Sequence, residues 1–173
     1  MLQVFGRYVR SVIERAAEEA QEAGSRTIEA EHLLLAIAAA DEDTTRELLA
    51  WAGLDHRAVG DALQREFEHS LGTAGVTAAD QEVLRPRRGE RRPSDAGTSA
   101  KLALERGMAA AGDKKDLRPA HILLGILELR AGTVPRALAL AGVDRRELRA
   151  RTQAAISDDG RQGPPEKPGK ASR

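Results

Sequence analysis

A stretch from the first third of this chain returns near its end, and this recurrence limits the possible folds more than any other feature. Residues 30–37 read AEHLLLAI and residues 120–126 read AHILLGI, so His121 follows His32 by 89 positions. The same offset relates six further pairs: Thr44, Ala50, Ala52, Gly53, Asp55 and Arg57 return as Thr133, Ala139, Ala141, Gly142, Asp144 and Arg146. Two long copies favour a closed pseudo-two-fold domain over an open solenoid, which needs about three repeats.

The apolar residues available for a core are almost all aliphatic. Hydrophobic residues make up 41% of the 173 positions, whereas aromatic residues make up only 2%. A chain rich in Ala, Leu, Glu and Arg and poor in β-branched residues favours helices over sheet, so an all-α fold is expected. The absence of cysteine excludes a disulfide framework, a thiolate metal site and a cysteine nucleophile, and it fits a reducing, cytoplasmic location.

Helical spacing of the apolar residues predicts about eight helices, four in each copy, within one domain over residues 1–156. The first repeat is expected over about residues 1–70 and the second over about residues 98–156. Between them, residues 71–97 lack apolar periodicity and contain several glycines and prolines, which predicts a mobile linker. Residues 157–173 hold prolines and glycines without an apolar run, so this tail is expected to be disordered.

The predicted helix ends follow from capping chemistry. Gly24 and Gly53 stand just past periodic segments, where glycine can take the left-handed conformation that closes a helix. Thr44 and Asp55 are the expected N-caps of the third and fourth helices, because their side-chain oxygens can accept from free backbone N–H groups.

We find no constellation of residues that predicts catalysis. His32 and His121 have no His, Cys or paired carboxylate three or four positions away, so a backbone hydrogen bond at a helix end is favoured over a metal site. The chain has neither a nucleophile elbow nor a phosphate-wrapping glycine loop. The sequence therefore predicts no enzyme activity, no metal and no cofactor.

Glu31 is the carboxylate of most interest. In the first turn of its helix it can complement the positive end of the helix dipole, an effect worth about 0.3–1 kcal/mol at an exposed position. It is also placed to accept a guanidinium group, with helix N-termini nearby to hold a phosphate. On the residues alone the structural role leads, and the binding role stays open.

The overall charge of the chain does not indicate a class of partner. The chain balances 27 acidic against 27 basic residues, which makes nucleic acid an unlikely partner, and it lacks a signal peptide or an apolar run long enough to span a membrane. One local exception lies between Arg85 and Arg92, where five arginines face one glutamate. This run is either an anion or polynucleotide contact or, more commonly, a charged loop that keeps itself soluble.

Several motifs together give the chain a family resemblance. The EHLLL run, its echo at residue 121, the L-A-x-A-G-[LV]-D closings of both copies and Phe5 at the start resemble the Clp N-terminal repeat domain of ClpA- and ClpC-type AAA+ unfoldases. The resemblance covers about residues 1–156. It implies a compact all-helical pseudo-dimer that performs no chemistry and recruits substrates and adaptors to the unfolding motor.

The resemblance also implies a ligand site. In ClpC-like members the glutamate before each histidine is implicated in recognising phosphorylated arginine, and Glu31 matches the first of them, with Phe5 and His32 as the neighbouring candidate binding residues. Ala120 stands where the second glutamate is expected, and alanine accepts no hydrogen bond, so the paired site is halved.

The function expected from the sequence is therefore protein binding without catalysis. With no ATPase following the repeats, the chain is expected to be a free-standing relative that acts as an accessory or decoy in Clp-dependent proteolysis. Its expected partners are Clp substrates or adaptors, phosphoarginine-bearing proteins or a Clp ATPase. The alternative is a nucleic-acid-associated regulator that uses the Arg85 to Arg92 linker.

Overall fold

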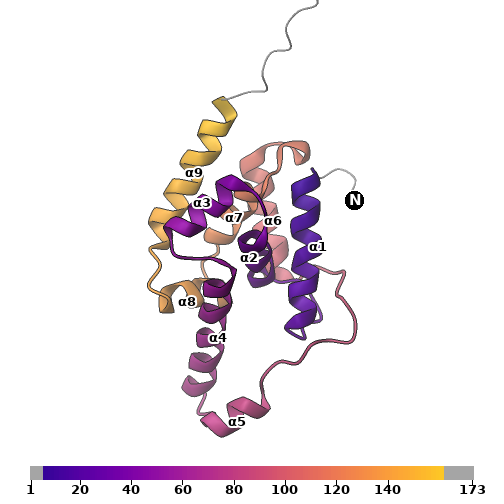
Figure 1. The fold of residues 1–173 in the computed structure, drawn as a ribbon, viewed down its shortest axis with the longest axis vertical. Helices are drawn as coiled ribbons and strands as arrows, with labels where there is room; N and C mark the ends of the chain where they lie inside the picture. Colours follow the sequence, from indigo (N-terminus) through magenta and orange to yellow (C-terminus); the bar gives the residue numbers. More distant parts are fainter. Residues whose placement is uncertain (1–5, 162–173) are drawn as a thin grey trace, which may run out of the picture.

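The computed structural model describes residues 6–161, and within that range the chain forms nine α-helices and no strand (Figure 1). Residues 1–5, which include Phe5, and residues 162–173 of the predicted tail lie outside the described residues. The all-α prediction is confirmed. The helices are α1 Arg7–Glu22, α2 Ala30–Ala39, α3 Asp43–Trp51, α4 His56–Thr73, α5 Ala78–Val83, α6 Thr98–Ala111, α7 Pro119–Leu127, α8 Thr133–Leu140 and α9 Arg145–Arg161.

The two repeats pack as a pseudo-two-fold pair, α1–α4 against α6–α9. Within the repeats, α1 packs on α2 as α6 packs on α7, and α4 packs on α2 as α9 packs on α7. Between the repeats, α4 contacts α8 as α9 contacts α3, and α2 contacts α7 at the centre. Each contact between the repeats therefore has a counterpart related by the pseudo-two-fold axis, which confirms the duplicated four-helix architecture.

The aliphatic core centres on α2 and α7. All nine residues of α7 are buried, and the largest fully buried side chains include Leu33, Ile37, Leu123 and Ile126. Small residues let α6 and α7 approach closely, because a Cβ added at Gly125 would stand 2.0 Å from the carbonyl oxygen of Ala103. A core without large aromatics is thus filled by close backbone packing.

Most predicted helix ends are confirmed. Gly24 follows α1 with φ +66°, and the Asp55 carboxylate accepts from the Ala58 N–H at 2.7 Å. The prediction that Thr44 caps the third helix is wrong. Glu42 is the N-cap, and α3 begins at Asp43, so Thr44 already lies inside the helix. The longer Glu42 side chain reaches the N–H groups of Thr44 and Thr45, at 3.2 and 2.9 Å.

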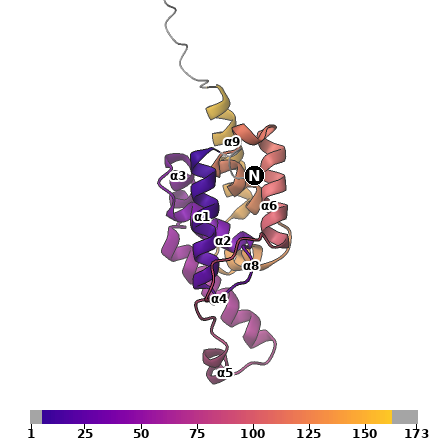
Figure 2. The same cartoon turned by 90° about the vertical axis from the view of Figure 1, so that its right-hand side faces the viewer.

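The segment between the repeats has more structure than its composition indicates. Helix α4 continues to Thr73, and α5 follows inside the predicted linker; both project from one end of the molecule in two perpendicular views (Figures 1 and 2). The chain then returns along α1, where the Gly89 N–H donates to the Gln21 carbonyl at 2.7 Å. At the other end of the chain, α9 runs to Arg161, into the range predicted to be a disordered tail.

The start of the second repeat is tied to the first by a short backbone pairing. The Ile28 N–H donates to the Asp95 carbonyl and the Gly97 N–H donates to the Ile28 carbonyl, both at 2.8 Å. Beside this pairing, the Ser99 hydroxyl donates to the Glu29 carboxylate and accepts from the Ala30 N–H at 2.9 Å. These bonds set α2 and α6 in a fixed relation.

Candidate functional site

A cleft of about 350 Å³ lies where the first turn of α2 meets α4, the linker and the start of α8. We call it the Glu31 cleft. Leu35, Leu63, Phe67 and Pro86 give it apolar walls, and Glu31, His32 and Glu66 supply its ionisable groups; Ala23, Ser25, Gly60, Gln64 and Thr133 complete the lining. Two of the three binding residues predicted from the sequence, Glu31 and His32, therefore line one cavity, while Phe5 lies outside the described residues.

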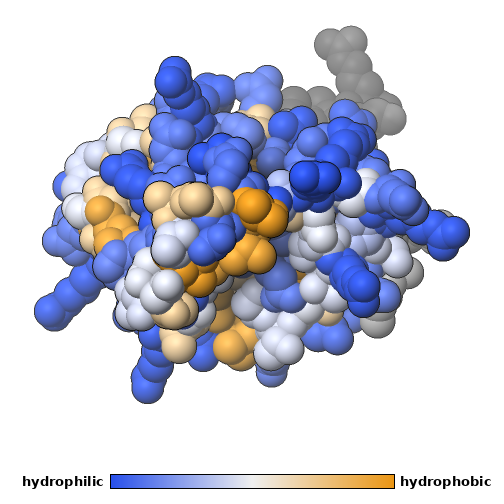
Figure 3. Space-filling model, turned by 90° about the horizontal axis from the view of Figure 1, so that it is seen from below, coloured by the Kyte–Doolittle hydropathy of each residue, from blue (hydrophilic) through white to orange (hydrophobic). Residues whose placement is uncertain are grey.

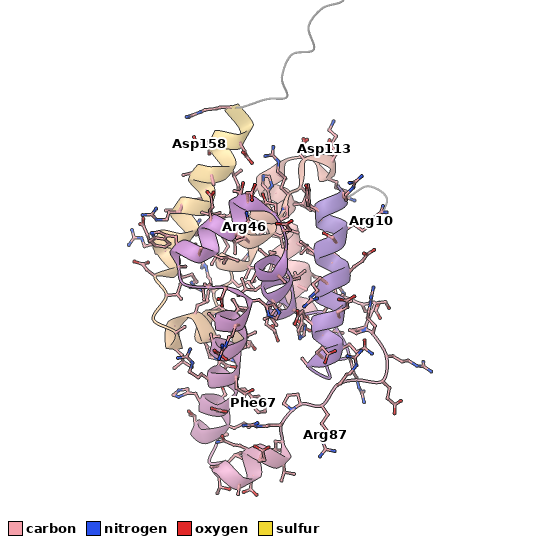
Figure 4. The ribbon with its side chains drawn as sticks, viewed as in Figure 1. Arg10, Arg46, Phe67, Arg87, Asp113 and Asp158 are labelled. Carbon is pink, nitrogen blue, oxygen red and sulfur yellow. The ribbon has the colours of Figure 1, made fainter. Side chains whose placement is uncertain are left out.

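The surroundings of the cleft combine apolar and polar groups. Phe67 lies on the side of α4 that faces the linker around Arg87 (Figure 4). Seen from the end where α5 projects, hydrophobic residues gather near the middle of the face and hydrophilic residues surround them (Figure 3).

Glu31 is a carboxylate without a counter-ion. It sits in the first turn of α2, is partly exposed, and forms no hydrogen bond or ion pair with another side chain of residues 6–161. Burial raises the pKa of Glu31, the charges of Glu29 and Glu66 raise it further, and Arg136 opposes them. A cation entering the cleft would relieve this unfavourable position.

His32 has a structural task that its sequence position already suggested. Its Nδ1 accepts from the N–H of Glu29 at 2.9 Å, and at the start of α7 the Nδ1 of His121 accepts from the N–H of Arg118 at 3.1 Å. The prediction of a histidine that bonds backbone at a helix end is confirmed. Burial lowers the pKa of both imidazoles, which keeps them neutral so that Nδ1 can accept.

Glu66 is the residue of the cleft that the sequence reading missed. Its carboxylate is buried and accepts from the Arg136 Nε at 2.7 Å and from the Ser70 hydroxyl, which links α4 of one repeat to α8 of the other. The signal that could have found it is its register, because Glu66 continues the apolar stripe of Val59, Ala62 and Leu63. A charged residue at such a position usually has a partner.

The second repeat does not reproduce this site. At the 89-residue offset, Ala120 replaces Glu31 and Ala155 replaces Glu66, so the corresponding positions carry no carboxylate. The expectation that one glutamate is missing thus extends to a second one. Among the described residues no group of three or more His, Cys, Asp or Glu side chains could hold a metal ion, and no helix is long and apolar enough to cross a membrane.

Three of the five linker arginines are paired within the chain. Arg92 lies 3.2 Å from Glu18, Arg85 lies 3.0 Å from Glu82, and Arg88 pairs with Glu22. Two of these three acceptors belong to α1, so the linker is held electrostatically along that helix. The pairing reduces the charge that the linker could offer to a polynucleotide.

Comparison with known proteins identifies the first repeat. Residues 5–85 match the family described as the Clp repeat (R) N-terminal domain. This stretch is therefore similar to one Clp repeat. The match spans α1 to α5, so it includes the whole Glu31 cleft except its Pro86 and Thr133 contributions. No protein with a curated description matches the chain.

Solved structures extend the Clp N-domain fold over both repeats. The N-terminal domain of the chaperone ClpD from Arabidopsis thaliana is 18% identical with a TM-score of 0.63, and covers 91% of this chain and 97% of its own. The N-domain of ClpV from Vibrio cholerae is 16% identical with a TM-score of 0.57, covering 91% and 87%. A protein studied as part of a malarial secretion system is 14% identical with a TM-score of 0.59, covering 89% and 95%. At these identities the likeness establishes the fold.

Proposed function

We propose that this chain is a non-catalytic binding module that engages protein substrates or adaptors of a Clp system in the cytoplasm. The observation that carries the proposal is the Glu31 cleft, in which an unpaired carboxylate faces apolar walls inside a Clp N-terminal domain. Such a cavity binds a cationic side chain through charge-assisted hydrogen bonds without needing a catalytic group.

The ligand group that best suits the cleft is an arginine guanidinium, and we include phosphoarginine among its ligands. Glu31 accepts the guanidinium while Leu35 and Leu63 contact the methylene stem. A phosphoryl group on the same guanidinium needs hydrogen-bond donors with positive or partly positive charge. Arg136, whose side chain is 57% exposed, and the N-terminal N–H groups of α8 beside Thr133 supply them.

Calorimetric titration tests the ligand. Phosphoarginine, arginine and phosphoserine are titrated into the wild type, Glu31→Gln and Glu14→Gln, an exposed glutamate of α1 that removes the same charge away from the cleft. We expect Glu31→Gln to weaken phosphoarginine binding by about tenfold or more, as loss of a charge-assisted bond does. Equal affinities in wild type and Glu31→Gln would separate Glu31 from this role.

A degradation assay tests the accessory role. The purified chain is added in excess to a Clp ATPase and protease that degrade an arginine-phosphorylated substrate. A decoy slows degradation because it sequesters the tag, whereas an adaptor accelerates it. An unchanged rate with a substrate that binds the chain contradicts both roles.

A further inference from the structure

A second cleft, of about 480 Å³, lies in the second repeat at the junction of α6, the end of α7 and the first turn of α9, helices that pack against one another. We call it the arginine cleft. Its lining consists of Leu127, Glu128 and five arginines, namely Arg106, Arg130, Arg145, Arg146 and Arg149. Five guanidinium groups thus face one carboxylate, in a chain whose charges otherwise balance.

Three of these arginines are held in place by the protein. Arg106 donates to the Glu128 carbonyl, Arg145 donates to the Leu129 carbonyl at 2.6 Å, and Arg149 lies 3.2 Å from the Glu128 carboxylate. The first two bonds use free backbone carbonyls just after the end of α7, and the third uses a side-chain carboxylate. Since a guanidinium has five N–H donors, each retains donors for a ligand.

Arg130 and Arg146 have no such partner. Both are exposed, and neither side chain forms a hydrogen bond or ion pair with any residue of the described range. By contrast, many other arginines of the chain pair with carboxylates, among them Arg15, Arg46, Arg118, Arg136 and Arg151. Uncompensated like charges around one concavity repel one another unless an anion enters.

The fold itself does not require this cluster. At the matching positions of the first repeat, Asp41 replaces Arg130, His56 replaces Arg145 and Gly60 replaces Arg149. Helix α2 nevertheless ends within one residue of the position that matches the end of α7. Arg146 has a counterpart in Arg57, but the other four arginines of the cleft occur in the second repeat alone.

We propose that the arginine cleft binds a phosphomonoester. A phosphate carries a charge near −2 and three acceptor oxygens, which suits several guanidinium groups around one cavity better than a single carboxylate does. The basic surface is a concavity and not a stripe. Asp144 directly precedes α9 and Glu147 lies in its first turn, so both are close in sequence to Arg145 and Arg146. This arrangement favours one compact anion over a polynucleotide backbone.

The inference is independent of the Glu31 cleft, which lies in other elements and for which we propose a cationic ligand. Its probes are inorganic phosphate and a short alanine-rich peptide that carries phosphoserine, serine or glutamate at one position. These are titrated at constant ionic strength into the ¹⁵N-labelled full chain while the arginine Nε–H signals are followed. We expect phosphate and the phosphoserine peptide to shift the Arg130 and Arg146 signals, and the serine peptide to leave them unchanged.

Paired variants sharpen the test. The double variant Arg130→Gln, Arg146→Gln should bind the phosphoserine peptide about tenfold more weakly or worse, because it loses two charged donors. The control Arg57→Gln, Arg91→Gln removes equal charge from two exposed arginines without a partner, and Arg57 occupies the position of the first repeat that matches Arg146. We expect the control to bind like the wild type and both variants to melt like the wild type.

The outcomes are distinct. Tighter binding of the phosphoserine peptide than of inorganic phosphate identifies a phosphorylated protein as the source, and equal binding identifies a small free phosphate. Equal affinities for the phosphoserine and serine peptides would overturn the proposal, as would an equal loss in the control. Single-stranded DNA that outcompetes the phosphoserine peptide, with affinity falling steeply as salt is added, would assign the cleft to nucleic acid instead.

Discussion

His32 and His121 fill a role that glutamate or glutamine usually fills, because each reaches back from the third helical position to the N–H of its own N-cap. We expect His32→Ala to lower the free energy of unfolding by about 1–3 kcal/mol, since it leaves a part-buried N–H without an acceptor. His32→Gln supplies an amide oxygen in the same place and should lose much less. Urea denaturation of the two variants at pH 7.5 makes the comparison, and equal losses would contradict the capping role.

The same two histidines predict a pH dependence. The pKa of each imidazole lies below 6.5 in the folded protein, so the unfolded chain takes up protons more readily. The contribution of the two histidines to the free energy of unfolding is therefore fully present above about pH 6.5. It declines as the pH falls through that value toward the lowered pKa. Denaturation curves from pH 8 to pH 5 should show a shallower decline for the double variant His32→Gln, His121→Gln than for the wild type.

Glu31 predicts a pH dependence of stability of the opposite sign, with stability lost as the pH rises. Its pKa is raised in the folded protein, so its contribution to stability is complete below the ordinary value of 4.5 and is lost as the pH rises. At pH 7 we expect Glu31→Gln to melt at a higher temperature than the wild type, with the gap closing at acid pH. Glu14→Gln, on an exposed face of α1, serves as the control and should shift the melting temperature less.

At the scale of elements, the α6–α7 contact depends on the missing side chain at residue 125. A Cβ there would stand 2.0 Å from a backbone carbonyl, so we expect Gly125→Ala to cost about 1–3 kcal/mol by overpacking. Gly60→Ala is a matched control inside α4, where a Cβ meets nothing within 4 Å, and should stabilise by about 0.5–1 kcal/mol. Thermal melts of both variants test this prediction. If Gly125→Ala left the melting temperature unchanged, α6 and α7 would be able to move apart without loss of stability.

At the scale of the whole molecule, neither repeat can bury its central helix alone. Helix α7 is buried along its full length by contacts that include α2 and α1 of the other repeat. We expect the separate fragments 1–93 and 94–173 to show no cooperative melting transition, and an equimolar mixture to regain helical circular dichroism. A fragment that melts cooperatively by itself would contradict this dependence.

The sequence predicts what depends on neighbours along the chain. The duplication, the helices, the Asp55 cap and the backbone hydrogen bond of His32 all rest on periodicity or on bonds spanning a few residues. Glu66 with Arg136, 70 positions apart, and the linker arginines with the glutamates of α1 depend on how distant segments meet, which no local pattern contains. Helix α5 is too short and too polar for periodicity to reveal it.

The replacement of both cleft carboxylates by alanine in the second repeat has a consequence for valence. A molecule with two equivalent binding sites can hold a target with several recognised groups at two points. It gains avidity because the second group is then at high local concentration. Under the proposed function the Glu31 cleft has no carboxylate-bearing counterpart in the second repeat, so each molecule would hold one tag there at its intrinsic affinity and release it at its intrinsic rate. Retention of such a target then depends on how many copies are gathered together.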